Sequence, residues 1–379
     1  MRRLFAFGVF FLTMAAITAA SHHYFYRRLV LDLNWGSATA EWTGAIVFAL
    51  LGATLPAGMI LQRRVAREVA RPFAFVSFVW MGLAFLLLSV LALSDLLRIA
   101  VGDAVAPQPW ARGVAAVTLA VVAIGALVGL QRPRAAVPIK RVPLALAKWP
   151  SSMTGFRVVQ LSDVHIGPTL GRPWLAGVVE QVNELAPDVV VITGDLVDGS
   201  VAQLAPHVAP LADLKSRFGT YFVTGNHEYY SGADAWLAHL ASLGVTALRN
   251  AAVRLGGDDD FVYLAGVDDW TAFGEGHGPD LAGALADTSA ERPVILLAHQ
   301  PRQFIEAAER GVDLQLSGHT HGGQIVPWNL FVRLQQPYVA GLARRGNSLL
   351  YTSRGTGYWG PPLRVGAPAE ITLLELRPA

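Results

Sequence analysis

Side chains that can bind metal ions or transfer protons recur in five short clusters within residues 163 to 321. The clusters are Asp163-Val164-His165, Asp195-Leu196-Val197-Asp198, Asn226-His227-Glu228, His299 and His319-Thr320-His321. They hold five of the ten His residues of the sequence. Because the sequence contains no Cys, any metal site must use imidazole, amide and carboxylate groups. Such ligands favour Mn, Fe or Zn.

These ligand types suit the hydrolysis of phosphate esters with the help of two divalent metal ions. A shared carboxylate can hold two ions about 3.5 to 4 Å apart, and the pair clamps the phosphoryl oxygens and activates a water for attack. Each cluster alone is weak evidence, because an Asp after a strand often forms a turn and a lone His is commonly structural. The combination of all five is what predicts an enzyme.

Each cluster follows a run of β-branched and apolar residues that is typical of a strand. The predicted strands are 156 to 161, 188 to 193, 219 to 224, 261 to 267, 293 to 298, 312 to 317, 348 to 352 and 370 to 376. Helical, Ala-rich stretches separate many of them, which indicates an α/β layered domain. Since open α/β sheets bind ligands beyond the carboxyl ends of their strands, we expect the clusters to lie in that crevice.

In this order the clusters resemble the motifs DxH, GDxxD, GNHE, H and GHTH of the calcineurin-like metallophosphoesterases. The resemblance covers residues 155 to 376 and implies a metal-dependent phosphoesterase with a four-layer α/β/β/α sandwich. Carried over by motif, it implies these ligands: Asp163, His165 and His321 for one metal, Asn226, His299 and His319 for the other, and Asp195 as the bridge. It also implies that His227 stabilises the transition state or protonates the leaving oxygen. Asp198 would orient the His227 ring, with turn formation before Gly199 as its alternative role.

Two details narrow the branch of the family. The second motif, Gly194 to Gly199, lacks the Arg that follows it in Ser/Thr protein phosphatases, which disfavours protein dephosphorylation. The stretch from Ser353 to Arg364 resembles the bacterial membrane-anchored branch, for which phosphodiesters and phospholipid-like substrates are the usual suggestion. The resemblance does not decide between monoesters and diesters, and it does not identify the metal.

The part before this domain has the composition of a membrane region. Hydrophobic residues make up 53% of the chain and charged residues only 15%, which is too apolar for an ordinary soluble protein. The apolar runs are 4 to 20, 42 to 61, 73 to 94 and 114 to 130, each near the roughly 20 residues that cross a bilayer. The first run could instead be a cleavable signal peptide, because it ends in Thr18, Ala19 and Ala20. We therefore predict about four transmembrane helices in residues 1–131, a linker in 132–154 and the hydrolase domain in 155–379.

The distribution of basic residues predicts the orientation. With four spans, 11 Lys and Arg residues lie near the runs on one side and four lie on the other. The 11 are Arg2, Arg3, Arg63, Arg64, Arg67, Arg71, Arg132, Arg134, Lys140, Arg141 and Lys148. The four are Arg27, Arg28, Arg98 and Arg112. Positively charged flanks stay in the cytoplasm, so the hydrolase domain is expected on the cytoplasmic face of the inner membrane. The formal net charge of only +2 does not favour a nucleic-acid partner. The expected partners are the membrane and a phosphate ester, including lipid-linked esters.

Two other classes compete with the enzyme. A transporter with a regulatory appendage would carry ionisable groups within its spans, yet Asp95 at the end of the third run is the one candidate. A catalytically inactive binding module would have lost ligands, whereas all seven metal positions implied by the resemblance are filled. Residues 322 to 346 follow the last motif with several aromatic and Arg residues; they either pack in the core or form an amphipathic lid on lipid. The sequence does not indicate an oligomeric state.

Overall fold

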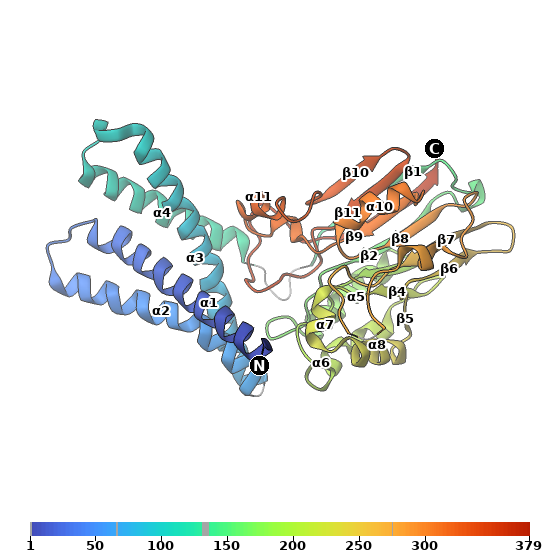
Figure 1. Ribbon diagram of the computed structural model, residues 1–379, viewed down its shortest axis with the longest axis horizontal. Coiled ribbons are helices and arrows are strands. Elements are labelled where there is room, and N and C mark those ends of the chain that lie inside the picture. Colours follow the sequence, from blue (N-terminus) through green and yellow to red (C-terminus); the bar gives the residue numbers. More distant parts are fainter. Residues whose placement is uncertain (1, 66, 131–135, 275) are drawn as a thin grey trace. The chain divides into compact units, whose positions relative to one another are not determined.

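The chain divides into two compact units in a computed structural model, which describes residues 2–65, 67–130, 136–274 and 276–379. One unit comprises Met1–Leu130 with Gly360–Leu363, and the other comprises Gln131–Trp359 with Arg364–Ala379. Figure 1 shows the first as long helices and the second as a layered arrangement of strands and helices.

The helical unit consists of α1 (Arg2–Tyr26), α2 (Ala38–Arg64), α3 (Arg67–Val101) and α4 (Pro107–Gly129), with a short π-helical segment at Arg27–Leu31 and a 3-10 turn at Gly102–Ala104. Three segments are long and apolar enough to cross a membrane: Ala38–Gly58, Arg67–Val101 and Pro107–Gly129. They contain or overlap the last three predicted runs. The first run lies within α1, some of whose side chains fall outside the described residues, so the fourth span stays a prediction.

Asp95, the residue to which the transporter hypothesis pointed, is engaged within the helical unit. Its carboxylate lies 2.7 Å from the Arg28 guanidinium and accepts a hydrogen bond from the Tyr24 hydroxyl at 2.6 Å. A charge near the end of a predicted span is stabilised by such a partner, since an unpaired charge would be costly there. The pairing gives Asp95 a structural role within the helical unit.

The second unit contains two six-stranded mixed sheets. The first has the order β1-β12-β2-β3-β4-β5, with β1 (Ile139–Leu146), β2 (Phe156–Leu161), β3 (Val189–Thr193), β4 (Thr220–Val223), β5 (Val245–Ala247) and β12 (Ile371–Pro378). The second has the order β10-β11-β9-β8-β7-β6, with β6 (Ala251–Gly256), β7 (Phe261–Gly266), β8 (Val294–Leu297), β9 (Leu314–Ser317), β10 (Gly341–Arg345) and β11 (Ser348–Thr352). Strands β2, β3, β4 and β5 are mutually parallel, as are β7, β8, β9 and β11.

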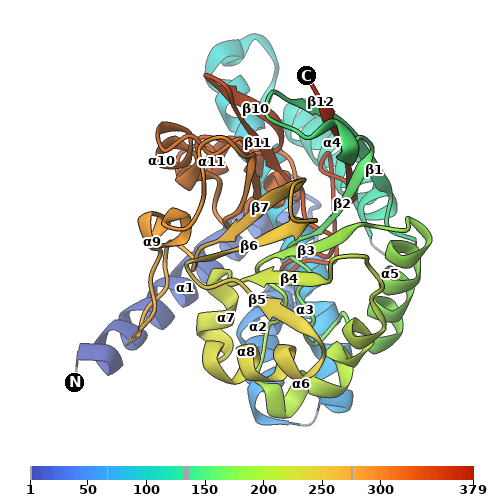
Figure 2. The same ribbon diagram turned by 90° about the vertical axis from the view of Figure 1, so that its right-hand side faces the viewer.

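Helices cover the outer faces of both sheets. The first sheet packs against α5 (Arg172–Glu184), α6 (Val201–Val208) and α8 (Ala233–Ser242), as Figure 2 shows beside β3, β4 and β5. The second packs against α9 (Leu281–Leu285) and α10 (Phe304–Glu309). Between the sheets, apolar side chains such as Val191, Leu297 and Leu316 form a common buried core. The predicted fold class, apolar helices followed by a two-sheet α/β domain, is confirmed.

The eight predicted strands all occur, with ends shifted by no more than two residues, but the linker prediction needs correction. Within 132–154, the chain forms β1, an edge strand that pairs with β12 in parallel. Only Val142, Leu144 and Leu146 are buried on it, and Pro143 is tolerated because an edge strand can lack one ladder donor. Because of this polar, interrupted pattern, β1 was not predicted as a strand from the sequence. Residues 131–135 of the predicted linker lie outside the described part of the chain.

Candidate active site

The five clusters lie at the carboxyl ends of five parallel strands. The carboxyl ends of β2, β3 and β4 carry the first three clusters. The carboxyl ends of β8 and β9 carry His299 and the His319–His321 pair. Parallel strands in one sheet end on the same edge, and the two stacked sheets present these edges together. Topology therefore brings residues more than 150 positions apart into contact.

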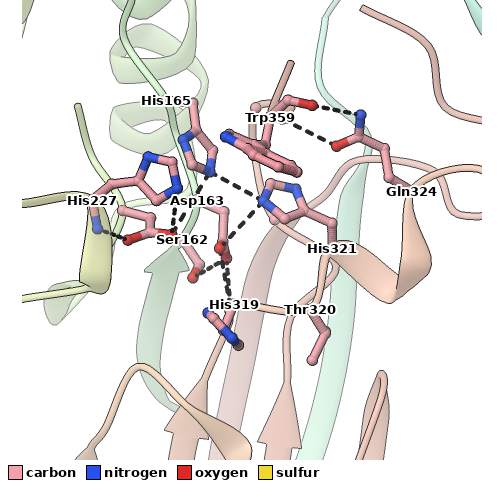
Figure 3. A network of polar contacts seen from close by, with 12 residues as sticks. Ser162, Asp163, His165, His227, His319, Thr320, His321, Gln324 and Trp359 are labelled. Atoms are coloured by element: carbon pink, nitrogen blue, oxygen red, sulfur yellow. Dashed lines mark hydrogen bonds and ion pairs between the residues drawn. The ribbon is translucent and has the colours of Figure 1, made fainter. Parts of the chain in front are cut away.

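Asp163, His165 and His321 form a first group, whose ligand atoms all lie within 4.8 Å of one another. The two imidazole Nε2 atoms are 3.1 Å apart, and His321 Nε2 lies 3.5 Å from Asp163 Oδ1. Figure 3 shows the three side chains pointing toward one another. Burial, reinforced by the neighbouring His165 and the buried Arg364 guanidinium, holds the pKa of His321 well below its usual value. Its imidazole is therefore neutral, the form that binds metals.

Asp195, His299 and His319 form a second group within the same distance limit. His299 Nε2 lies 3.2 Å from both Asp195 Oδ2 and His319 Nδ1. The other nitrogen of His299 contacts the Thr193 carbonyl at 2.7 Å, and because a carbonyl only accepts, Nδ1 carries the proton. Burial, together with His299, lowers the pKa of His319 to about 3 and keeps it neutral.

Asn226 begins the short helix α7 (Asn226–Ser231) and belongs beside the second group. Its neighbour His227 donates a backbone hydrogen bond to Asp195 Oδ1 at 2.9 Å, so the start of α7 lies against that carboxylate. The Asn226 Oδ1 atom is buried and has no hydrogen-bond partner within the described residues. A buried acceptor without a donor is costly unless another group satisfies it, and a cation would do so.

Asp195 lies between the two groups. Its Oδ2 atom is 3.2 Å from His299 Nε2 and 3.9 Å from His165 Nε2, so one carboxylate reaches ligands of both. Burial alone would favour the protonated acid, but His299 and His227 hold the pKa of Asp195 well below its usual value. The carboxylate is consequently ionised, as a bridging ligand must be.

Asp198 contacts two imidazoles. Its Oδ1 atom lies 2.6 Å from His227 Nδ1 and 2.9 Å from His165 Nδ1. Burial raises the pKa of Asp198, but the two rings lower it far more, so the group is ionised. The sequence predicted the contact with His227 but not the one with His165. One carboxylate therefore fixes the ring orientation of both a candidate ligand and a candidate acid.

His227 is charged in the protein without metal ions. Burial alone would lower the pKa of His227. The carboxylates of Asp195 and Asp198 together have a larger, opposite effect and raise that pKa to about 9. Because Nδ1 faces Asp198, the Nε2 atom points the other way and lies 4.0 Å from Asp195 Oδ2. His227 thus presents an N–H donor beside the Asp195 carboxylate.

The backbone is strained at several of the candidate metal ligands. Five residues without the freedom of glycine adopt positive φ angles, namely Asp163, His165, Asp195, His319 and His321. Such conformations cost free energy and cluster at functional sites. The motif glycines make room for the carboxylates: a Cβ on Gly318 would lie 2.2 Å from Asp163 Oδ2, and one on Gly225 would lie 2.2 Å from Asp195 Oδ1.

Two supporting residues had no role assigned from the sequence. The buried Glu228 carboxylate accepts backbone hydrogen bonds from Asp195, Leu196 and Gly225 at 2.7–3.0 Å, so it ties the third motif to the second. Burial and the nearby Asp195 charge raise its pKa to about 7. Arg364 is buried beside His321 and donates to the Arg354, Gly357 and Ala367 carbonyls. The GNHE motif could have pointed to Glu228 from the sequence. No local sequence pattern pointed to the role of Arg364.

All nine residues predicted for the site lie at this edge of the sheets, and the comparisons with known proteins fit this arrangement. A family model described as Calcineurin-like phosphoesterase matches residues 156–323. The Transmembrane protein with metallophosphoesterase domain of Bos taurus is 45% identical over 277 residues, covering 70% of this chain and 62% of that protein. An uncharacterized metallophosphoesterase of Aquifex aeolicus is 34% identical over 229 residues, covering 59% and 86%.

The uncharacterized metallophosphoesterase YkuE of Bacillus subtilis is 33% identical over 236 residues, which cover 60% of this chain and 81% of that protein. The chain therefore spans less than two thirds of the length of the bovine relative but most of these two bacterial relatives.

Proposed function

Because the chain belongs to the calcineurin-like metallophosphoesterase family, we propose that it is a membrane-associated hydrolase of phosphate monoesters or diesters that uses two divalent metal ions. The observation that carries the proposal is the position of Asp195, whose carboxylate reaches ligands of both candidate metal groups. Filled ligand positions argue against an inactive binding module.

We assign one ion to Asp163, His165 and His321 and the other to Asn226, His299 and His319, with Asp195 shared. The neutral imidazoles of His319 and His321 and the unpartnered Asn226 oxygen support this assignment. The ligand set, without sulfur, suits Mn, Fe or Zn. When bound, such ions polarise the phosphoryl oxygens and lower the pKa of a water.

We assign the leaving-group proton to His227. Asp198 fixes the ring through Nδ1, which leaves the Nε2 proton directed toward the reacting phosphate beside Asp195. The Asp198 carboxylate favours the protonated form of the ring, which a proton donor to the leaving oxygen requires. Asp198 is then a positioning residue for both His227 and His165.

Metal removal tests the proposal. Full-length protein in detergent should lose turnover after treatment with a chelator and regain it with Mn, Fe or Zn, binding two ions per chain by elemental analysis. The substrates are a phosphomonoester, a phosphodiester and a lipid-linked ester. A fragment that starts at residue 150 is unsuitable because it lacks β1. Full turnover by protein that contains no metal would contradict the proposal.

A lipid-linked ester is the second candidate substrate, and exposed apolar residues favour it. Helix α11 (Trp328–Val332) follows the last metal motif and has no buried residue, so the core-packing hypothesis is wrong for this helix. Leu330 and Phe331 are exposed, and Leu334 is 83% exposed beside Arg333. Apolar and basic side chains together suit a bilayer surface with anionic headgroups. In the same assay, changing Leu330, Phe331 and Leu334 to Ser should lower turnover of the ester in micelles and spare a soluble analogue.

The catalytic unit is proposed to lie on the cytoplasmic face of the inner membrane as part of a multipass protein. The three membrane-length helices support a multipass arrangement. The basic residues near the apolar runs support the orientation, because 11 lie on the predicted cytoplasmic side and four on the other. A C-terminal fusion should therefore give a fluorescent reporter in the cytoplasm and an inactive alkaline phosphatase. An active phosphatase fusion without fluorescence would reverse the orientation.

A further inference from the structure

Two exposed aromatic rings flank His227. The ring centroid of Tyr230 lies 5.4 Å from that of the imidazole, and the centroid of Trp359 lies 6.0 Å from it. Both rings stand steeply to the imidazole plane, at 65° and 78°. Tyr230 is 67% exposed and Trp359 is 54% exposed, so much of each ring is available to a ligand.

The position of Trp359 is fixed by the loop that carries the last metal motif. The Gln324 side chain is buried and binds the Trp359 backbone twice, donating to its carbonyl at 2.9 Å and accepting from its N–H at 3.0 Å. Figure 3 shows this pair beside His321 and His165. The preceding Tyr358 is buried, and Arg364 donates to the Gly357 carbonyl at 3.0 Å. The backbone of Trp359 is thus held while its indole remains open to solvent.

The role of His227 indicates which part of the substrate lies beside these two rings. In hydrolysis, the bond between phosphorus and the ester oxygen breaks, the oxygen of water replaces it, and the leaving oxygen takes the proton of His227 Nε2. The proton released by the water restores the imidazolium. Since the leaving oxygen must approach His227 within hydrogen-bond reach, the organic part attached to it lies beside the side chains that surround His227. Tyr230 and Trp359 are two of them.

We propose that Tyr230 and Trp359 form the subsite for the leaving alcohol and select phosphate esters whose leaving alcohol carries a flat aromatic ring. This inference rests on the proposed function and names its substrate class. Aromatic side chains hold flat rings by stacking, and they do so without hydrogen-bond readout. Because the backbone of Trp359 is held before substrate binds, little main-chain ordering opposes the contact.

Matched leaving groups test the inference in full-length, metal-loaded protein. Benzyl and ethyl phosphate release alcohols of similar basicity, so a difference in kcat/KM between them reports contact with the alcohol. Cyclohexylmethyl phosphate adds bulk without a flat ring. We expect Trp359→Ala to lower kcat/KM for benzyl phosphate roughly tenfold, mainly through KM, and to affect the other two esters much less. Trp359→Phe should restore part of the loss, and Tyr230→Ala should show the same selectivity in weaker form.

Trp270→Ala is the matched control. Trp270 is 48% exposed, but its ring lies against Arg302, and its loss should leave all three rates unchanged. Metal content is measured for every variant. Equal losses on all three esters in Trp359→Ala and Tyr230→Ala with metals retained, or no loss at all, would overturn the inference and leave the proposed function standing. Failure of metal-loaded wild-type protein to hydrolyse both these monoesters and the corresponding phosphodiesters would instead overturn the proposed function, and this inference with it.

Discussion

Replacing Asp195 with Asn should remove metal from both ligand groups and reduce hydrolysis to background. The Asp195 Oδ2 atom lies 3.2 Å from His299 Nε2 and 3.9 Å from His165 Nε2, so the loss of one negative charge affects two sites at once. The substitution preserves shape, and an amide oxygen can still accept the backbone hydrogen bond from His227. The domain should therefore remain folded. Elemental analysis of the purified variant and turnover after metal reconstitution check the result.

Asp313→Asn provides the control for this change. Asp313 is also buried, but it accepts a hydrogen bond from the Val294 N–H and pairs with Lys148, away from the metal clusters. Its variant should keep both ions and its rate, even if thermal stability falls. If Asp195→Asn retains two ions per chain and near-normal turnover, the carboxylate is not a bridge and the ligand assignment is wrong.

His227→Ala should keep both metal ions and lose roughly 10² to 10⁴-fold in kcat, the usual contribution of a positioned acid or base. The ring is held by Asp198 through Nδ1 and presents Nε2 beside Asp195, but it is not among the proposed ligands. Metal analysis together with steady-state kinetics separates the two effects. Asp198→Asn should be more disruptive to the metals than His227→Ala, because Asp198 also orients His165.

The identity of the leaving group decides what His227 does. An acid is needed most when the leaving oxygen is strongly basic, so His227→Ala should slow an alkyl ester far more than a p-nitrophenyl ester. Equal losses on both would show that His227 stabilises charge rather than transferring a proton. A normal rate on both would remove His227 from the mechanism.

The fold was predictable from sequence where strands are buried on both faces. Strands such as β3 and β8 consist of apolar runs in which every residue is buried, and their positions were predicted closely. The strands that were missed, β1, β5, β6 and β10, lie at or near the sheet ends and expose much of their length. Their polar patterns resemble loops. The order of strands, including the pairing of β1 with β12, depends on contacts between distant residues that no local pattern encodes.

Site residues were predictable by type and motif, but their mutual contacts were not. The metal-binding chemistry of Asp195 or His321 was predicted from residue type and from the order of the five motifs along the chain. The double contact of Asp198, by contrast, requires that His165 and His227 approach the same oxygen from two different loops. Arg364 acts beside His321 from 43 residues further along the chain. Such relations depend on tertiary structure, and no local motif carries them.

The place of β12 in the first sheet sets the order in which this protein matures. Residues 371–378 lie between β1 and β2, so they bind to both the first and second strands of the domain after every other strand has left the ribosome. The apolar helices precede this domain in the chain, so they are synthesised before the first sheet can be completed. A chain that ended before β12 would lack the strand that joins β1 to β2, and the clusters from Asp163 to His321 would belong to an incompletely folded domain.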